Sequence, residues 1–436
     1  MPLDSVNPRS EVVNVPEEVT GQPRRLVLGH QLWRSTFSSL KHRNFRLFFS
    51  GQLISLIGTW MQNTAQGWLV YELTHSKVLL GVVAAVGSAP MMLFSIWGGS
   101  IADRHPKRQI LLWTQSAMMV FAFIFAGLVW SGRIQPWHIL VLAALGGLAM
   151  AFDMPARQAF MVEMTSREDL INAISLNSSI VNGARVIGPS VAGLLMAKVG
   201  MTACFFLNGL SFLAVIAGLW MMRLAPFVPP ARANSNWEHA VEGFGYVWHH
   251  ARMRTILILF AIVGIFGWSY AVLMPAFASD VLRVGQTQYG ALLSANGIGA
   301  LLGALTVATF GTRINRRLLV LGGLGIFSAM LLLLALVPNY YLALLLLGLG
   351  GWGMLLFFST TNTLLQTSAS DEMRGRVMGI WALIFGGMTP IGGLVAGTLA
   401  HYFGVPAAMA VGALVCAVAA VVVWKIIRRR DAAARS

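Results

Sequence analysis

The stretch GARVIGPSVAG, at residues 183–193, holds three glycines, a proline and an arginine inside a long apolar segment. It returns 204 positions later as GMTPIGGLVAG, at residues 387–397. When residues 183–200 are compared with 387–404, eight of 18 positions are identical. A short stretch that recurs after about half the chain length, with glycines inside apolar segments, predicts two related halves. The two halves would share one orientation in a membrane.

The composition agrees with that interpretation. The chain has 436 residues, of which 56% are hydrophobic and 11% charged, whereas soluble domains carry about 25% charged residues. Twelve apolar runs are long enough to cross a bilayer, at residues 46–72, 78–102, 109–131, 137–160, 171–198, 202–222, 254–281, 288–310, 317–337, 340–366, 376–400 and 406–427. We therefore predict an all-α membrane protein whose twelve transmembrane helices form two parallel, pseudo-symmetric six-helix bundles.

The polar segments divide the chain further. We expect a mostly disordered cytoplasmic tail at 1–44, an N-terminal bundle at 45–222, a cytoplasmic linker at 223–253, a C-terminal bundle at 254–428 and a cytoplasmic tail at 429–436. With both termini inside, 26 of the 31 lysines and arginines are cytoplasmic, as the positive-inside rule requires. The net charge of +15 is then explained by topology and lipid headgroups, and no nucleic-acid partner is needed.

The loop between the second and third predicted helices reads GGSIADRHPKR, residues 98–108. It resembles the signature loop of the major facilitator superfamily, in which a glycine precedes an Asp-Arg pair and a basic pair. The resemblance implies the major facilitator fold and a charge cluster that locks one conformation. Asp103 would be its acid, Arg104 and Arg108 its partners, and Gly99 a close-packing residue. Pro106 stands where the family usually has glycine, so the turn must be made differently. The alternative is a basic loop that only sets topology.

The opening stretch lies on the fifth predicted helix and resembles the Gly-Pro motif of superfamily antiporters. Glycines let a facing helix approach closely, and a proline removes one backbone hydrogen bond. The resemblance implies a tight contact between the halves that favours export, made by Gly183, Gly188, Pro189 and Gly193. Ordinary small-residue packing is the alternative.

Three charges are embedded in the predicted helices. Asp153 and Arg157 lie one turn apart on the fourth helix, and Arg185 lies at similar depth on the fifth. Because an ionisable group inside a membrane is costly, we expect each to face a cavity or a partner, with Asp153 able to pair with Arg185. We interpret the three as candidates for proton coupling, and a permanent salt bridge is the alternative. The stretch DMPAR, residues 153–157, resembles the superfamily branch that contains the enterobactin exporter and macrolide or multidrug efflux proteins.

Polar side chains recur at three- and four-residue steps along the first helix. Lipid cannot satisfy their hydrogen bonds, so they face protein or a watery cavity. We interpret them as cavity lining, and hydrogen bonding between helices is the alternative. On the first helix the candidate cavity residues are Gln52, Ser55, Thr59, Gln62, Asn63 and Gln66. The tenth predicted helix offers an opposing polar set of Thr360, Thr361, Asn362 and Gln366. Trp268, Tyr270 and Phe357 are candidates for stacking on a flat substrate, and lipid or core contact is the alternative.

The sequence lacks a phosphate-binding Gly-Lys-Ser/Thr loop, a nucleophile elbow and paired metal-ligand spacing. We therefore predict neither an enzyme nor a metal or cofactor site, and Cys204 and Cys416 are interpreted as packing residues. The predicted function is proton-driven export, as an antiporter, of a hydrophobic small molecule such as a siderophore or drug. The alternatives are an uptake permease or facilitator of a small metabolite, and a non-transporting sensor or scaffold, for which embedded charges would be unnecessary.

The resemblance implies a bacterial inner-membrane protein with cytoplasmic termini. We expect a monomer in contact with the lipid bilayer and a small-molecule substrate, and leave open whether a periplasmic or outer-membrane efflux partner receives the cargo. In the second copy of the repeat, Thr389 stands where the first has Arg185. Because the embedded charges are confined to the first half, we expect coupling there, and mainly cavity wall and hinge in the second half.

Overall fold

The computed structural model describes residues 37–224, 226–227, 244–311, 313–370 and 373–433. Most of the predicted N-terminal tail and linker, and residues 434–436 of the C-terminal tail, therefore lie outside the described residues. All helices from α2 onward belong to one unit that begins at Ser39. The described residues contain helices and connecting segments, and no strand.

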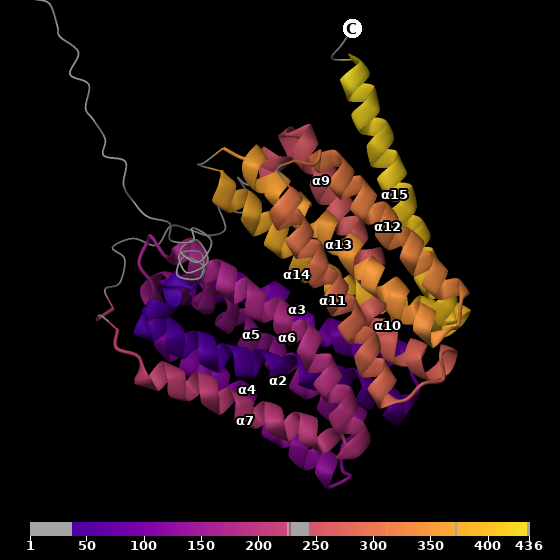
Figure 1. The fold of residues 1–436 in the computed structure, drawn as a ribbon. Helices are drawn as coiled ribbons and strands as arrows, with labels where there is room; N and C mark the ends of the chain where they lie inside the picture. Colours follow the sequence, from indigo (N-terminus) through magenta and orange to yellow (C-terminus); the bar gives the residue numbers. More distant parts are fainter. Residues whose placement is uncertain (1–36, 225, 228–243, 312, 371–372, 434–436) are drawn as a thin grey trace, which may run out of the picture. The chain divides into compact units, whose positions relative to one another are not determined.

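The first half of the chain folds into six long helices. After the short η1 (Ser38–Lys41) they are α2 (Arg43–Thr74), α3 (Lys77–Arg104), α4 (Lys107–Trp130), α5 (Pro136–Met164), α6 (Leu170–Lys198) and α7 (Met201–Met221). Within this half, α2 packs against α6 and α7, while α5 packs against α3 and α4. These helices are the indigo-to-magenta group in Figure 1.

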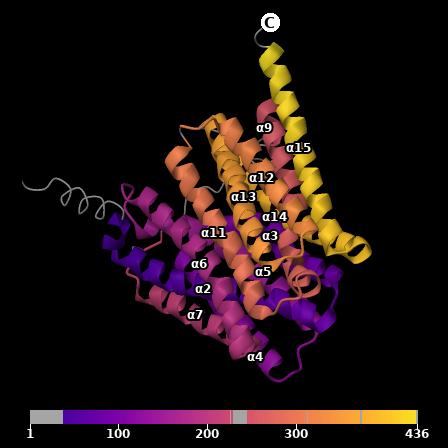
Figure 2. The ribbon, with the colours of Figure 1, turned by 45° about the vertical axis from the view of Figure 1, so that its right-hand side comes forward.

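The second half repeats the arrangement. Its first membrane segment is broken into α9 (Ala251–Ile262), π-helical η2 (Val263–Gly267), α10 (Tyr270–Ala276) and π-helical η3 (Phe277–Val281). The others are α11 (Gln286–Phe310), α12 (Arg316–Leu336), α13 (Tyr340–Ser368), α14 (Arg374–Phe403) and α15 (Val405–Ala433). Here α13 packs against α11 and α12, and α12 against α15. In Figures 1 and 2 the C-terminal end of α15 extends beyond its neighbours.

Among the described residues, eleven segments are long and apolar enough to cross a membrane, and the broken segment Ala251–Val281 counts as one of them. The predicted first helix, α2, is the long helix that is not among the eleven. Its 32 residues include five amide side chains, those of Asn44, Gln52, Gln62, Asn63 and Gln66, which lower its hydropathy. Both cysteines are buried free thiols, consistent with packing.

Loop contacts define two ends of the unit. At one end, called the basic end here, Lys41 pairs with Asp169 and Lys107 with Glu163. At the opposite end, Lys77 pairs with Asp280. Since successive helices alternate in direction, the loop that carries Asp103 lies at the basic end.

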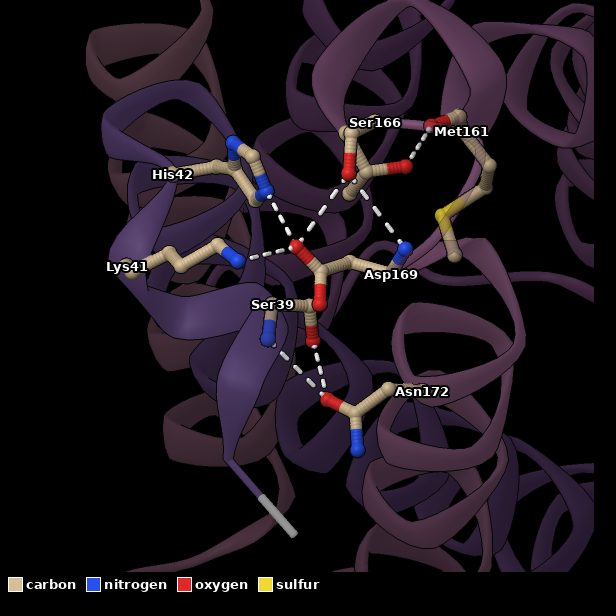
Figure 3. A network of polar contacts seen from close by, with 8 residues as sticks. Ser39, Lys41, His42, Met161, Ser166, Asp169 and Asn172 are labelled. Carbon is tan, nitrogen blue, oxygen red and sulfur yellow. Dashed lines mark hydrogen bonds and ion pairs between the residues drawn. The ribbon is translucent and has the colours of Figure 1, made fainter. Parts of the chain in front are cut away.

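Figure 3 shows how the start of α2 is fixed at the basic end. The Asp169 carboxylate lies 2.7 Å from Lys41 Nζ and 2.7 Å from His42 Nε2. Asn172 Oδ1 accepts hydrogen bonds from the backbone nitrogen (3.1 Å) and hydroxyl (2.6 Å) of Ser39. The loop between α5 and α6 therefore holds the first turns of the described chain against α6.

Candidate functional site

The repeat identified in the sequence forms the contact between the halves. A methyl group on Gly193 of α6 would lie 2.8 Å from the carbonyl oxygen of Gln286 and 3.1 Å from Cα of Gly290, both on α11. Its counterpart Gly397 of α14 would meet the carbonyl oxygen of Lys77 on α3 at 2.7 Å. The fifth helix of each half thus packs closely on the second helix of the other.

The contact extends from mid-membrane to the opposite end. On the α6–α11 side, Ser190 Oγ donates to Ser294 Oγ at 2.7 Å, and Ser294 Oγ donates to the Val186 carbonyl at 2.7 Å. Beside the α3–α14 contact, the Tyr71 hydroxyl donates to Asp280 at 2.5 Å, and Lys77 Nζ lies 3.4 Å from the same carboxylate. Asp280 therefore joins the halves where the opposite end closes.

Towards the basic end the halves separate around a partly open cavity of about 760 Å³ between α3, α5, α13 and α14. Apolar side chains dominate its lining, among them Met91, Met92, Met150, Met154, Phe358 and Phe385. Gln158 and Arg376 also line it. A cavity of this size fits a small organic molecule, and methionines adapt to irregular ligands.

The second half supplies an aromatic wall. The rings of Trp381 and Phe385 stack at 5.7 Å between centroids, Phe358 meets Phe385 edge-on at 5.3 Å, and Phe260 stacks on Trp381 at 5.2 Å. Three of these four residues line the 760 Å³ cavity, and Phe260 lines a narrow pocket beside it together with Trp268. Such a wall suits a flat or apolar ligand.

Arg185 lies at the middle of the contact between the halves. Its guanidinium donates to Asn296 Oδ1 of α11 at 3.0 Å and lies over the rings of Trp60 (5.9 Å) and Trp268 (5.4 Å). Among the described residues it makes no salt bridge. A charged group near the bilayer centre costs at least about 2.5–3.5 kcal/mol, and each cation–π contact offsets roughly 0.5–2 kcal/mol.

The predicted pairing of Asp153 with Arg185 is wrong in this structure. Asp153 is fully buried and pairs with Arg157 one turn away, accepting its Nε at 2.9 Å and also its terminal nitrogen. Thr114 and Gln115 of α4 donate to the other carboxylate oxygen at 2.8 and 2.7 Å. The acid faces α4 rather than α6, because equal depth in two helices does not fix the direction of a side chain.

The expected charge cluster of the 98–108 loop is not formed. Asp103 is exposed and makes no ion pair among the described residues, and Arg104 is exposed as well. Arg108 donates instead to the carbonyl of Trp220 on α7 at 2.9 Å. If this charge cluster locks one conformation, its ion pairs are broken in the conformation whose cavity faces the basic end.

The close-packing glycine of this loop was also assigned to the wrong position. A methyl group on Gly98 would overlap the Ala151 carbonyl of α5, whereas Gly99 has no atom within 4 Å of such a methyl and lines the cavity. The antiporter-type stretch divides similarly. Gly193 and the Pro189 carbonyl face α11, Gly188 packs on Trp60 of α2, and a methyl group on Gly183 would meet no atom of another segment within 4 Å.

The polar stripe of α2 points mainly into the first bundle, which corrects its interpretation as cavity lining. Gln52 is 3% exposed, Gln62 accepts a 2.7 Å hydrogen bond from Asn208 of α7, and Thr59 donates to its own helix. Gln66 is partly buried. Asn63 is exposed and lies three residues from Trp60, on the same helix face.

Of the candidate cavity residues in the second half, some line a pocket and others are buried in the bundle. Trp268 lines the narrow pocket, while Tyr270 is buried and accepts a 2.8 Å hydrogen bond from Asn296. Thr361 is 1% exposed, and Asn362 is partly buried and accepts a hydrogen bond from Gln366. Phe357 is fully buried but lines the narrow pocket, and Thr360 is buried.

Sequence reasoning missed three features, namely Asp280, Asp169 and the aromatic wall. An acid at the end of an apolar run was the available signal for Asp280. The wall joins Phe260 to three residues much further along the chain, so no local sequence pattern marked it. In the part of the chain that the structure describes, no group of three or more His, Cys, Asp or Glu could hold a metal ion.

Comparison with known proteins gives one family and several relatives. The pattern of the transmembrane secretion effector family matches residues 34–435. The staphyloferrin A transporter of Staphylococcus aureus is 26% identical, over 83% of this chain and 90% of its own. The multidrug efflux pump Tap of Mycolicibacterium fortuitum is 28% identical, over 78% and 85%. The enterobactin exporter EntS of Escherichia coli is 27% identical, over 81% and 85%.

Solved structures share the fold. A mutant of the nucleoside transporter NupG superposes with a TM-score of 0.72 at 14% identity, covering 89% of this chain and 98% of its own. A bacterial homologue of the human lysosomal transporter Spinster gives 0.71 at 15% identity, covering 89% and 97%. At this identity the likeness concerns the fold alone. These relatives and neighbours are transporters, which agrees with the prediction that the chain is not an enzyme.

Proposed function

Because this chain belongs to the transmembrane secretion effector family, a branch of the major facilitator superfamily, we propose that it is a proton-driven exporter of hydrophobic small molecules. The observation that carries the proposal is the cavity of about 760 Å³ that opens towards the basic end while the halves are in contact at the opposite end. In alternating access, such a conformation loads cargo from the side that the cavity faces.

The direction of transport depends on which side the basic end faces. Lys and Arg clusters favour the cytoplasmic side, so we assign the basic end, and with it both termini, to the cytoplasm of a bacterial inner membrane. Cargo then enters the cavity from the cytoplasm. The printed names of two relatives, an efflux pump and an exporter, support export, and siderophores or drugs are the cargo classes that they suggest.

For energy coupling we propose protons. The Asp153–Arg157 pair is the embedded acid and base that the described bundle offers, and Arg185 is the embedded cation at the contact between the halves. We propose no cofactor, because a proton gradient supplies the free energy for transport. We propose a monomer that releases cargo towards the periplasm.

The test is transport by the purified chain in proteoliposomes of known orientation. A panel of siderophores and drugs is loaded on the side of the basic end, and a pH gradient is imposed. We expect cargo to cross faster with the gradient than without it, and the advantage to vanish with a protonophore. Transport only in the reverse direction would refute export, and gradient-independent transport would refute coupling.

A further inference from the structure

Arg185 is a cation whose partners leave most of its hydrogen-bonding capacity unused. A guanidinium carries five N–H donors, and in the described chain the side chain of Arg185 makes one hydrogen bond, to Asn296. No carboxylate pairs with it among the described residues. An internal salt bridge would have been the usual way to stabilise such a charge in a membrane.

The surroundings hold the guanidinium in place without neutralising it. Asn296 donates through Nδ2 to the Tyr270 hydroxyl (2.8 Å) and the Leu347 carbonyl (3.3 Å), which turns Oδ1 towards Arg185. The rings of Trp60 and Trp268 lie on the cation from α2 and from the break between η2 and α10. Four membrane segments from both halves thus position one positive charge.

Aromatic rings connect Arg185 with the cavity, although Arg185 itself is not among the described residues that line either pocket. Trp268, which contacts Arg185, lines the narrow pocket and meets Phe385 edge-on at 6.3 Å, and Phe385 lines both that pocket and the 760 Å³ cavity. No Asp or Glu is among the described residues that line either pocket. The described lining therefore offers no carboxylate to an organic cation, whereas the Arg185 guanidinium beside it favours an anion.

We propose that Arg185 is a binding residue for an oxyanion of the cargo, so that the protein selects aromatic or apolar organic anions and rejects organic cations. The inference rests on the proposed function and specifies its substrate class. The cargo's apolar body packs on methionines and aromatic rings, and its carboxylate or similar group receives the remaining N–H donors of Arg185, which can bind such a group in a bidentate manner.

The experiment measures equilibrium binding of three ring-matched probes, namely naphthoate, naphthamide and naphthylmethylammonium, to the purified full chain in nanodiscs. We expect naphthoate to bind roughly tenfold more tightly than naphthamide, as one charge-assisted pair provides, and the ammonium probe to bind most weakly. Arg185→Gln is expected to remove the preference for naphthoate while retaining naphthamide binding. Arg133→Gln, at an exposed loop position, makes the same change in net charge and should leave the preference intact.

A second variant keeps the proposal testable if Arg185→Gln does not fold. Asn296→Asp is nearly isosteric and places a carboxylate against the guanidinium, so it should abolish the preference for naphthoate by internal neutralisation. Equal binding of all three probes by the unaltered chain would overturn the inference. So would an equal loss of all three in Asn296→Asp, which would indicate a structural contact only.

Transport separates this inference from the proposed function. Gradient-driven export of the ammonium probe in preference to naphthoate would overturn the anion site and leave export standing. Absence of gradient-driven transport for every cargo would refute the export function, while the binding ratio would still decide the anion site.

Discussion

The buried pair on α5 allows the sharpest prediction, the substitution Asp153→Asn. The carboxylate is fully buried, and one of its oxygens is bonded twice by Arg157. The substitution leaves Arg157 without its counter-charge, while Thr114 and Gln115 can still donate to the remaining amide oxygen. Breaking a buried pair by removing one partner costs about 3–5 kcal/mol, and we expect a loss of that size in the free energy of unfolding.

The double variant Asp153→Asn with Arg157→Gln should recover most of this loss. Both charges are then absent, and neutral replacement of a buried pair is often close to neutral in stability. The assay is unfolding in mixed detergent micelles, followed by circular dichroism. The matched control is Asp103→Asn, which makes the same change at an exposed acid without an ion pair among the described residues, and should change stability by no more than about 0.5 kcal/mol.

Two results would refute this reasoning. A double variant as unstable as Asp153→Asn would show that lost hydrogen bonds, not an unpaired charge, cause the effect. A single variant as stable as the unaltered chain would show that Arg157 does not need the charge of the carboxylate in the resting structure. Transport by the double variant then addresses coupling, because gradient-driven export that persists without either charge would exclude this pair as the coupling site.

Three further predictions concern packing and the two ends. Gly98→Ala should lower the free energy of unfolding by about 1–3 kcal/mol, since its methyl group overlaps the α5 backbone. Gly99→Ala should leave stability nearly unchanged, and thermal unfolding of the two variants tests the difference. Asp280→Asn weakens contacts with Tyr71 at the opposite end, so spin-label distances there should show a larger open population. Asp169→Asn removes the counter-charge at the start of α2, and hydrogen exchange of residues 39–46 should accelerate.

The sequence was most informative where a pattern repeats. The glycines at 183–193 and 387–397 predicted both the symmetry and a close contact, and the two copies do form equivalent contacts through Gly193 and Gly397. This worked because a close helix approach leaves a signature of small residues in the sequence itself. The pattern could not show that Gly188 packs within its own half while Gly193 packs on the other.

Direction around a helix axis was the information that the sequence lacked. Counting along the sequence places Asp153 and Arg185 at similar depth, yet Asp153 turns towards α4 and Arg185 towards α11. The α2 stripe correctly defines one helix face, but that face is covered by neighbours such as Asn208 of α7 rather than by a cavity. Spacing along a chain gives the face of a helix, whereas the neighbour that covers it depends on packing between helices.

The asymmetry between the copies acquires a physical meaning from this geometry. The second half was expected to supply cavity wall, and the aromatic wall of Phe260, Phe358, Trp381 and Phe385 comes from it. The first half contributes Arg185, held by Asn296 of the second. Thr389 replaces the arginine in the other copy, so α14 has a neutral residue at the position equivalent to Arg185. One symmetric contact can therefore serve closure, while the other combines closure with the positive charge that we propose as the anion site.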